Sequence, residues 1–178
     1  MTKNVKKVSL VIPIFNEINN IKNLIYELIK YLSLIKELEY EIICVNDFSN
    51  DGTSDELVLL SKQIDNLVII NHTINYGQSK AIYNGINKAK YNTIITIDGD
   101  GQNDPYNINS LLNKYFSDEN LKLIGGIRVK RKDSFIKLFS SKIANYIRMK
   151  ILKDDCKDTG CSLKIFDKEI FLQFPFFK

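Results

Sequence analysis

Residues 93–105 read TIITIDGDGQNDP, an apolar and β-branched run that ends abruptly in two aspartates. Such a run predicts a strand buried on both faces, which is typical of a parallel sheet covered by helices. Asp98 and Asp100 follow the run and are separated by Gly99. Because ligands of open parallel sheets gather at the carboxyl ends of the strands, this stretch predicts both a fold class and a site.

The pattern of apolar run, polar loop and helical period recurs along the chain. Strands are also predicted at 8–14, 40–45, 67–71, 121–126 and 162–166. The spacing of apolar residues predicts helices at 21–32, 54–63, 79–89, 105–118 and 135–152. We therefore expect an α/β fold, a mostly parallel sheet flanked by helices, forming one domain over residues 1–178.

The composition excludes several classes of protein. Apolar residues make up 44% and charged residues 26% of 178 residues, which is typical of one globular domain. The net charge of +4 is too small to indicate nucleic acid as a partner. Three Cys in an irregular pattern indicate reduced thiols and a cytoplasmic location. A single His, with no Cys/His cluster, excludes multi-imidazole or multi-thiolate zinc sites, so any metal must sit on oxygen ligands.

The two aspartates after the run at 93–97 are the best metal candidates. Alternate residues of an extended chain share a face, so Asp98 and Asp100 can approach one ion. Gly99 allows a bulky ligand to come close to the backbone, and Gln102 could add a neutral oxygen. Hard oxygen pairs suit Mg²⁺ or Mn²⁺ held together with substrate phosphates.

Acidic residues also follow the first two predicted strands. Glu17 follows the first, and Asp47 and Asp51 follow the second. Around Asp47 and Asp51, a turn that needs Asp, Asn and Ser for purely structural reasons explains the pattern equally well. Neither a Gly-x-Gly-x-x-Gly motif after the first strand nor a Gly-Lys-Ser/Thr loop is present, which argues against dinucleotide oxidoreductases and P-loop enzymes.

Four motifs together resemble family-2 glycosyltransferases. They are 13–17 (PIFNE), 45–53 (VNDFSNDGT), 98–105 (DGDGQNDP) and 158–164 (DTGCSLK). The sequence is most similar to the polyprenyl-phosphate sugar transferase branch, of which dolichyl-phosphate mannose synthase is the familiar example. The resemblance implies the GT-A fold of nucleotide-diphospho-sugar transferases.

The resemblance also implies roles for individual residues. The nucleotide-binding residues would be Pro13, Phe15, Glu17, Asp47, Gly77, Lys80, Asp98 and Gly99. The metal ligands would be Asp100, Gln102 and Asp98, and the acceptor phosphate would meet Arg128, Lys137 and Ser141. Asp98, Asp100 and Arg128 would be the catalytic residues, with Arg128 as a two-pronged phosphate clamp.

Four positions depart from the family pattern. Asn46 stands where many members have Asp, and Phe48 replaces a usual Gly beside the base pocket. Gly99 and Gly101 replace the commoner Ala and Leu, which loosens the metal loop without removing a ligand. The identity of the base therefore stays open.

The implied reaction is the inverting transfer of a sugar from a nucleotide-diphosphate donor to a polyprenyl-phosphate lipid, assisted by Mg²⁺ or Mn²⁺. A phosphate monoester is already largely ionised at pH 7, so this acceptor needs no general base. We expect the stretch 134–153 to form an amphipathic helix, which suits either a membrane surface or an ordinary core equally. Its membrane-surface form places the protein at the inner face of the membrane, as a peripheral protein that can form homo-oligomers. The apolar residues 174–177 suggest that the natural chain continues.

Two alternatives remain open at this stage. A nucleotide-sugar transferase that acts on a saccharide hydroxyl needs a base, for which Asp158 is the candidate by position. A non-enzymatic receiver-like domain also gathers carboxylates and Mg²⁺ at strand ends. It is disfavoured because the acids here follow the second and fourth predicted strands.

Overall fold

The computed structural model describes residues 5–127, 158 and 160–176. At its centre is a six-stranded sheet with the order β3-β2-β1-β4-β6-β5. The strands are β1 (Lys6–Ile14), β2 (Leu38–Asn46), β3 (Leu67–Asn71), β4 (Thr93–Thr96), β5 (Leu123–Gly125) and β6 (Lys164–Asp167). β1 to β4 pair in parallel, and β6 is antiparallel to both β4 and β5. The predicted mostly parallel sheet is confirmed.

The helices alternate with the strands along the first two thirds of the chain. They are α1 (Ile21–Ser33), α2 (Thr53–Ser61), α3 (Gln78–Lys88), the 3₁₀ turn η1 (Pro105–Asn107), α4 (Ile108–Ser117) and α6 (Lys168–Leu172). The single helix predicted at 105–118 is wrong in its first turn, because the Asp104 carboxylate accepts the Tyr106 N–H and holds a 3₁₀ turn. The predicted amphipathic helix at 134–153 lies outside the described residues. Of the helices in the described ranges, none combines the length and the apolarity that a bilayer crossing needs.

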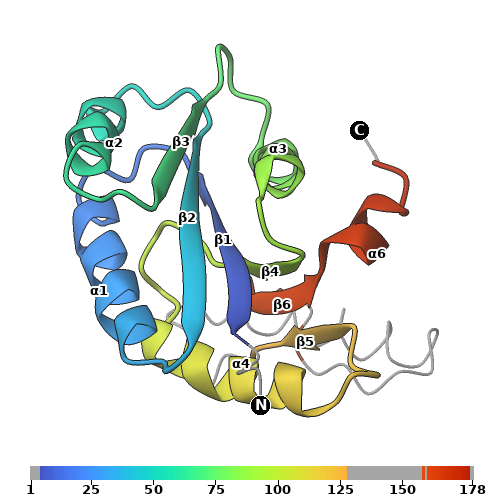
Figure 1. Cartoon of the computed structure of the whole chain (residues 1–178). Coiled ribbons are helices and arrows are strands. Elements are labelled where there is room, and N and C mark those ends of the chain that lie inside the picture. Colours follow the sequence, from blue (N-terminus) through green and yellow to red (C-terminus); the bar gives the residue numbers. More distant parts are fainter. Residues whose placement is uncertain (1–4, 128–157, 159, 177–178) are drawn as a thin grey trace, which may run out of the picture.

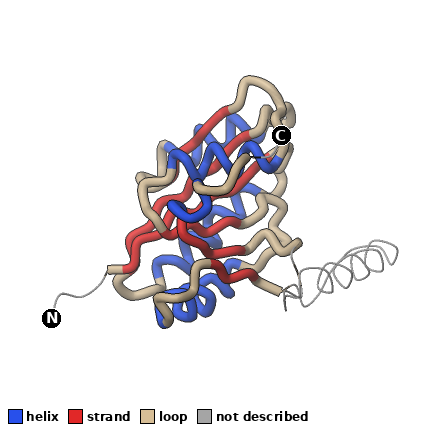
Figure 2. The backbone as a smooth tube through the Cα atoms, turned by 90° about the vertical axis from the view of Figure 1, so that its right-hand side faces the viewer, coloured by secondary structure: helices blue, strands red, loops and turns tan. Residues whose placement is uncertain are grey.

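Helices cover both faces of the sheet, which gives three layers (Figures 1 and 2). Leu10 and Ile12 of β1 pack with α1, α2 and α4 on one face, around Leu28. Val11, between them, packs with Ile86 of α3 on the opposite face. The alternation of faces along β1 thus explains why this strand is apolar throughout.

Helix α3 approaches the sheet unusually closely at Gly85. A Cβ atom at this position would clash with Val11 and would lie 3.0 Å from Cγ2 of Val45. Only glycine allows the helix to pack against β1 and β2 at this distance. Because α3 follows β3 in a parallel layer, this packing brings the first turn of α3 to the carboxyl edge of the sheet.

Candidate functional site

A cavity of about 210 Å³ lies at the carboxyl edge, between the ends of β1, β2 and β4 and the start of α3. Its lining consists of Pro13, Ile14, Phe15, Glu17, Asp47, Gln78, Ala81, Asp98, Gly99 and Asp100. The sequence predicted seven of these residues as site residues and missed Ile14, Gln78 and Ala81. Gln78 and Ala81 lie three positions apart in the first turn of α3 and therefore share one face of the helix.

Asp47 at the end of β2 is buried and accepts three hydrogen bonds from the protein. Its Oδ1 accepts hydrogen bonds from Nδ1 of His72 at 2.7 Å and from the Tyr76 N–H at 2.9 Å. Its Oδ2 accepts the N–H of Gly77 at 2.7 Å. Burial, the largest single influence, raises the pKa of Asp47, but these hydrogen bonds together outweigh it and lower the pKa below its ordinary value. Asp47 therefore stays ionised and ties β2 to the loop before α3.

His72 supports Asp47 from the end of β3, and only 4% of its side chain is exposed. Its Nε2 lies 2.9 Å from Nδ2 of Asn84, an amide that can only donate. The two partners therefore fix the orientation of the ring, with Nδ1 toward Asp47 and Nε2 toward Asn84. His72 and its two partners come from three separate parts of the chain, so this role could not be predicted from local sequence.

Asp98 and Asp100 after β4 have a different environment. Oδ1 of Asp98 accepts Nε2 of Gln78 at 2.7 Å, and Oδ1 of Asp100 accepts the Gln102 N–H at 3.0 Å. Burial raises the pKa of Asp98, and the neighbouring Asp100 raises it further, against hydrogen bonds from Ser162 and Gln78 that lower it. Two such carboxylates in one cavity stabilise a cation.

The donor set in this cavity fits a hard divalent ion. Within the described ranges, no group of three or more His, Cys, Asp or Glu side chains is arranged so that it could hold a metal ion by itself. Two carboxylates therefore leave most coordination positions to phosphate oxygens and water, as Mg²⁺ prefers. The third predicted ligand, Gln102, lines a neighbouring cleft instead of this cavity.

Two predicted nucleotide-binding residues do not line the cavity. Gly77 contributes through its N–H, which binds Asp47. The ammonium group of Lys80 lies 5.0 Å from the ring centre of Tyr83 and 4.8 Å from that of Phe176. Cation–π contacts of this kind hold Lys80 against aromatic rings.

Asp51 has the structural role that the turn interpretation predicted. Its Oδ1 accepts the Thr53 N–H at 3.0 Å, and its Oδ2 accepts the Ile18 N–H at 3.1 Å. Burial raises the pKa of Asp51, but these bonds outweigh it and lower the pKa. Asp51 thus joins the loop after β1 to the first turn of α2.

A second cleft of about 520 Å³ lies beside the turn formed by residues 98–103, called the acidic turn below. It is lined by Gln102, Asn103, Asp104, Asn107, Ser110, Leu111, Gly126, Ile127, Cys161 and Leu163. Gly126 and Ile127 directly precede Arg128 in the sequence. The predicted acceptor residues Arg128, Lys137 and Ser141 themselves lie outside the described residues.

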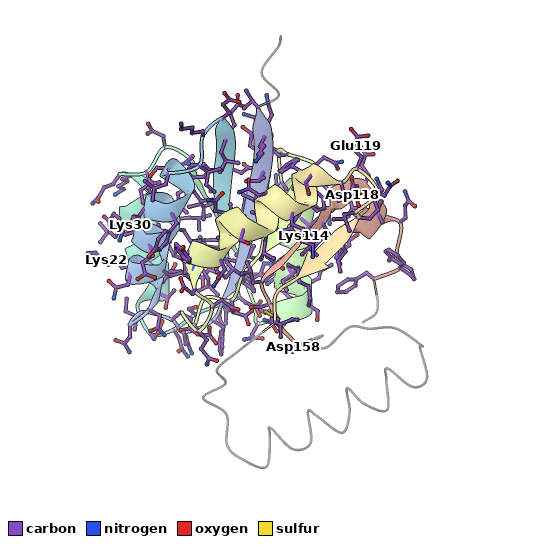
Figure 3. The ribbon with its side chains drawn as sticks, turned by 90° about the horizontal axis from the view of Figure 1, so that it is seen from below. Lys22, Lys30, Lys114, Asp118, Glu119 and Asp158 are labelled. Carbon is purple, nitrogen blue, oxygen red and sulfur yellow. The ribbon has the colours of Figure 1, made fainter. Side chains whose placement is uncertain are left out.

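Asp158, the candidate base of the alternative reaction, is buried with 6% of its surface exposed. Its Oδ1 accepts the Gly160 N–H at 3.2 Å. Figure 3 shows Asp158 at the edge of the ribbon, away from Asp118 and Glu119, the acidic pair that follows α4. Among the described residues that line the two cavities, Asp158 is absent.

Known proteins are similar to this one in sequence over most of the chain. The undecaprenyl-phosphate 4-deoxy-4-formamido-L-arabinose transferase of Photorhabdus laumondii is 36% identical over 169 residues, which covers 93% of this chain and 50% of that protein. The enzyme of the same name from Yersinia pestis is 33% identical over 167 residues, with the same coverage. The chain thus spans about half the length of the curated relatives it matches.

Solved structures with the same fold include two glycosyltransferases. The mannosyltransferase PcManGT from Pyrobaculum calidifontis, in complex with GDP-Man and Mn²⁺, superposes with a TM-score of 0.67 at 17% identity, over 93% of this chain and 46% of that one. Glucosyl-3-phosphoglycerate synthase from Mycobacterium tuberculosis, with Mn²⁺, UDP and phosphoglyceric acid, gives 0.72 at 15% identity, over 96% and 59%. The predicted GT-A fold is confirmed. The sequence model of glycosyl transferase family 2 matches residues 9–174, and the chain belongs to this family.

Proposed function

We propose that the chain binds a nucleotide-diphosphate sugar and transfers the sugar to a polyprenyl-phosphate lipid, with inversion and with the help of Mg²⁺ or Mn²⁺. The observation that carries the proposal is the cavity shared by Asp47, Asp98 and Asp100. Asp47 accepts three hydrogen bonds from the protein, whereas Asp98 and Asp100 lie together after the end of β4. This division of roles suits a nucleoside at one end of the cavity and a diphosphate at the other.

Asp47 suits the nucleoside end. Its Oδ1 already accepts two hydrogen bonds, while its Oδ2 accepts one and has room for another. A nucleobase ring N–H, such as N3–H of uracil or N1–H of guanine, matches that single remaining acceptor position. Phe15 lines the same cavity and is 48% exposed, so a base can stack on its ring.

Asp98 and Asp100 suit the diphosphate end. A divalent ion there would stabilise the negative charge that develops on the departing nucleotide. Gly99 lies between them. A Cβ atom at this position would lie 3.2 Å from the carbonyl oxygen of Pro13, so the absence of a side chain lets the backbone stay close to β1. The carboxylates are thereby held at the cavity wall, where they can orient the donor.

The second cleft suits the acceptor. It borders the acidic turn, and its wall runs through Gly126 and Ile127 directly into the segment that begins with Arg128. The similarity to undecaprenyl-phosphate sugar transferases supports a lipid phosphate over a saccharide hydroxyl. A peripheral location at the cytoplasmic face of the membrane belongs to the same proposal.

Thermal-shift titration with UDP and GDP, with and without Mn²⁺, tests the donor site. We expect one nucleotide to raise the melting temperature further when Mn²⁺ is present than when it is absent, and Asp100→Asn to abolish this Mn²⁺-dependent gain. Asp118→Asn is the matched control, because Asp118 is exposed and caps only the Asn120 N–H. If neither nucleotide stabilises the wild-type chain under any condition, the donor assignment is wrong.

A transfer assay then distinguishes the acceptors. With the nucleotide sugar that binds, a polyprenyl phosphate should accept the sugar, and the corresponding dephosphorylated lipid should not. Transfer to a saccharide hydroxyl that depends on Asp158 would replace the lipid proposal by the alternative.

A further inference from the structure

Ser162, just before β6, reaches back to the acidic turn after β4. Lys164 of β6 pairs with Thr96, and continuing this antiparallel register places Ser162 opposite Asp98. The hydroxyl oxygen of Ser162 accepts the Asp98 N–H at 3.2 Å and Nδ2 of Asn103 at 2.7 Å. One hydroxyl thus contacts both ends of the turn from Asp98 to Asn103.

We propose that Ser162 is a positioning residue, which holds this turn so that Asp98 and Asp100 face the same ion. The inference rests on the proposed metal-assisted function. Ser162 is not among the residues that line the donor cavity, so it acts through Asp98 and Asn103.

The turn needs such an anchor for physical reasons. Two neighbouring carboxylates repel one another, which favours conformations that separate them. Gly99 and Gly101 give the backbone freedom to adopt those conformations, and Gly101 already has a φ of +69°. A hydroxyl that binds both ends of the turn opposes this opening.

Ser162 is itself held in place. Its carbonyl oxygen accepts the Thr96 hydroxyl at 2.7 Å, which extends the β4–β6 pairing to the edge of the site. The neighbouring Cys161 is buried, and its Sγ lies 3.7 Å from Oδ1 of Asn103. The anchor therefore belongs to the rigid sheet, while the turn it holds does not.

The same contacts form the wall between the two cavities. Asp98 lines the donor cavity, whereas Asn103 and Cys161 line the second cleft. Ser162 connects these residues, so the late motif 158–164 serves the metal turn from the acceptor side.

The test is the coupling between Mn²⁺ and the nucleotide in Ser162→Ala. Calorimetry gives the dissociation constant of UDP or GDP, whichever stabilises the wild-type chain, without and with saturating Mn²⁺. We expect Ser162→Ala to reduce the Mn²⁺-dependent gain in affinity about tenfold, since the two hydrogen bonds to its hydroxyl are lost. Metal-free nucleotide affinity should stay within about twofold, because the nucleoside end is untouched.

Two further variants sharpen the result. Ser162→Thr keeps the hydroxyl and should restore the coupling, and Asn103→Ala removes one of the contacts and should lose part of it. Ser117→Ala is the matched control, because its hydroxyl only caps the Lys114 carbonyl on α4. Should Ser162→Ala not fold, Asn103→Ala carries the test.

The outcomes separate this inference from the proposed function. A wild-type chain whose nucleotide affinity ignores Mn²⁺ contradicts the proposed function itself. If the wild type is coupled and Ser162→Ala is equally coupled, or if the variant loses affinity equally with and without Mn²⁺, the positioning role is wrong.

Discussion

The ends of β2 and β4 place aspartates at the same edge of the same sheet, yet their surroundings are opposite. Asp47 accepts three hydrogen bonds from the protein and has a lowered pKa. Asp98 lies beside Asp100 and has a raised pKa, first because of burial. The comparison shows that an acidic residue after a parallel strand can either be tied into the fold by several hydrogen bonds or keep most of its acceptor positions open. Only the residues that reach it from other elements decide which.

The largest expected effect is on activity and concerns Asp100, after β4. Asp100→Asn should lower kcat about 100-fold or more, because one charge that holds the divalent ion is lost. The free energy of unfolding should change by less than about 0.5 kcal/mol, because the amide can still accept the Gln102 N–H and charge repulsion is relieved. Steady-state kinetics and urea unfolding measure the two quantities. A strong loss of stability would erase the distinction between the two strand ends.

At Asp47, after β2, we expect the main effect on stability. Asp47→Asn should lower the free energy of unfolding by about 2–3 kcal/mol, since charge-assisted bonds are lost and a buried N–H loses its acceptor. Urea unfolding of this variant beside Asp118→Asn checks the prediction. Unchanged stability would mean that Asp47 is free to serve the ligand alone.

The dependence of the free energy of unfolding on pH in the acid range provides a second test of the role of Asp47. Because folding lowers the pKa of Asp47, its ionisation stabilises the protein above the ordinary carboxyl pKa of about 4, and this contribution is lost as the pH falls through the lowered value. The Asp47→Asn variant has no carboxylate at this position, so its free energy of unfolding should fall less steeply below about pH 4 than that of the wild type. Unfolding midpoints measured across this range provide the check. Parallel curves for the two proteins would contradict the assignment.

The smallest expected effect concerns the loop between β2 and α2. Phe48, next to Asp47, has a φ of +65°, a conformation that costs most side chains about 1 kcal/mol. Phe48→Gly should therefore raise the free energy of unfolding by up to about 1 kcal/mol, whereas Phe48→Ala, which keeps a Cβ, should not. Denaturation of both variants tests this. A gain in the alanine variant alone would place the strain in the ring instead of the backbone.

Much of the fold was predictable from the sequence, because apolar runs and helical periods are local signals. The acid residues of the donor cavity were predictable for a related reason, since parallel strands bring their carboxyl ends to one edge. His72 and Gln78 were not predictable as partners of aspartates, because β3 and α3 approach β2 and β4 only in the folded chain. Lys80 reads as a donor-site residue, and only tertiary packing against Phe176 reveals its aromatic contacts.

The position of Ser162 late in the chain has a consequence for the order of events during synthesis. Ser162 follows Asp98 by 64 residues, so the acidic turn emerges from the ribosome long before its anchor. At about 5–20 residues per second, this delay lasts roughly 3–13 s, far longer than a loop needs to close. A nascent chain therefore carries two mutually repelling carboxylates on an open segment for several seconds, and translation speed sets how long that state persists.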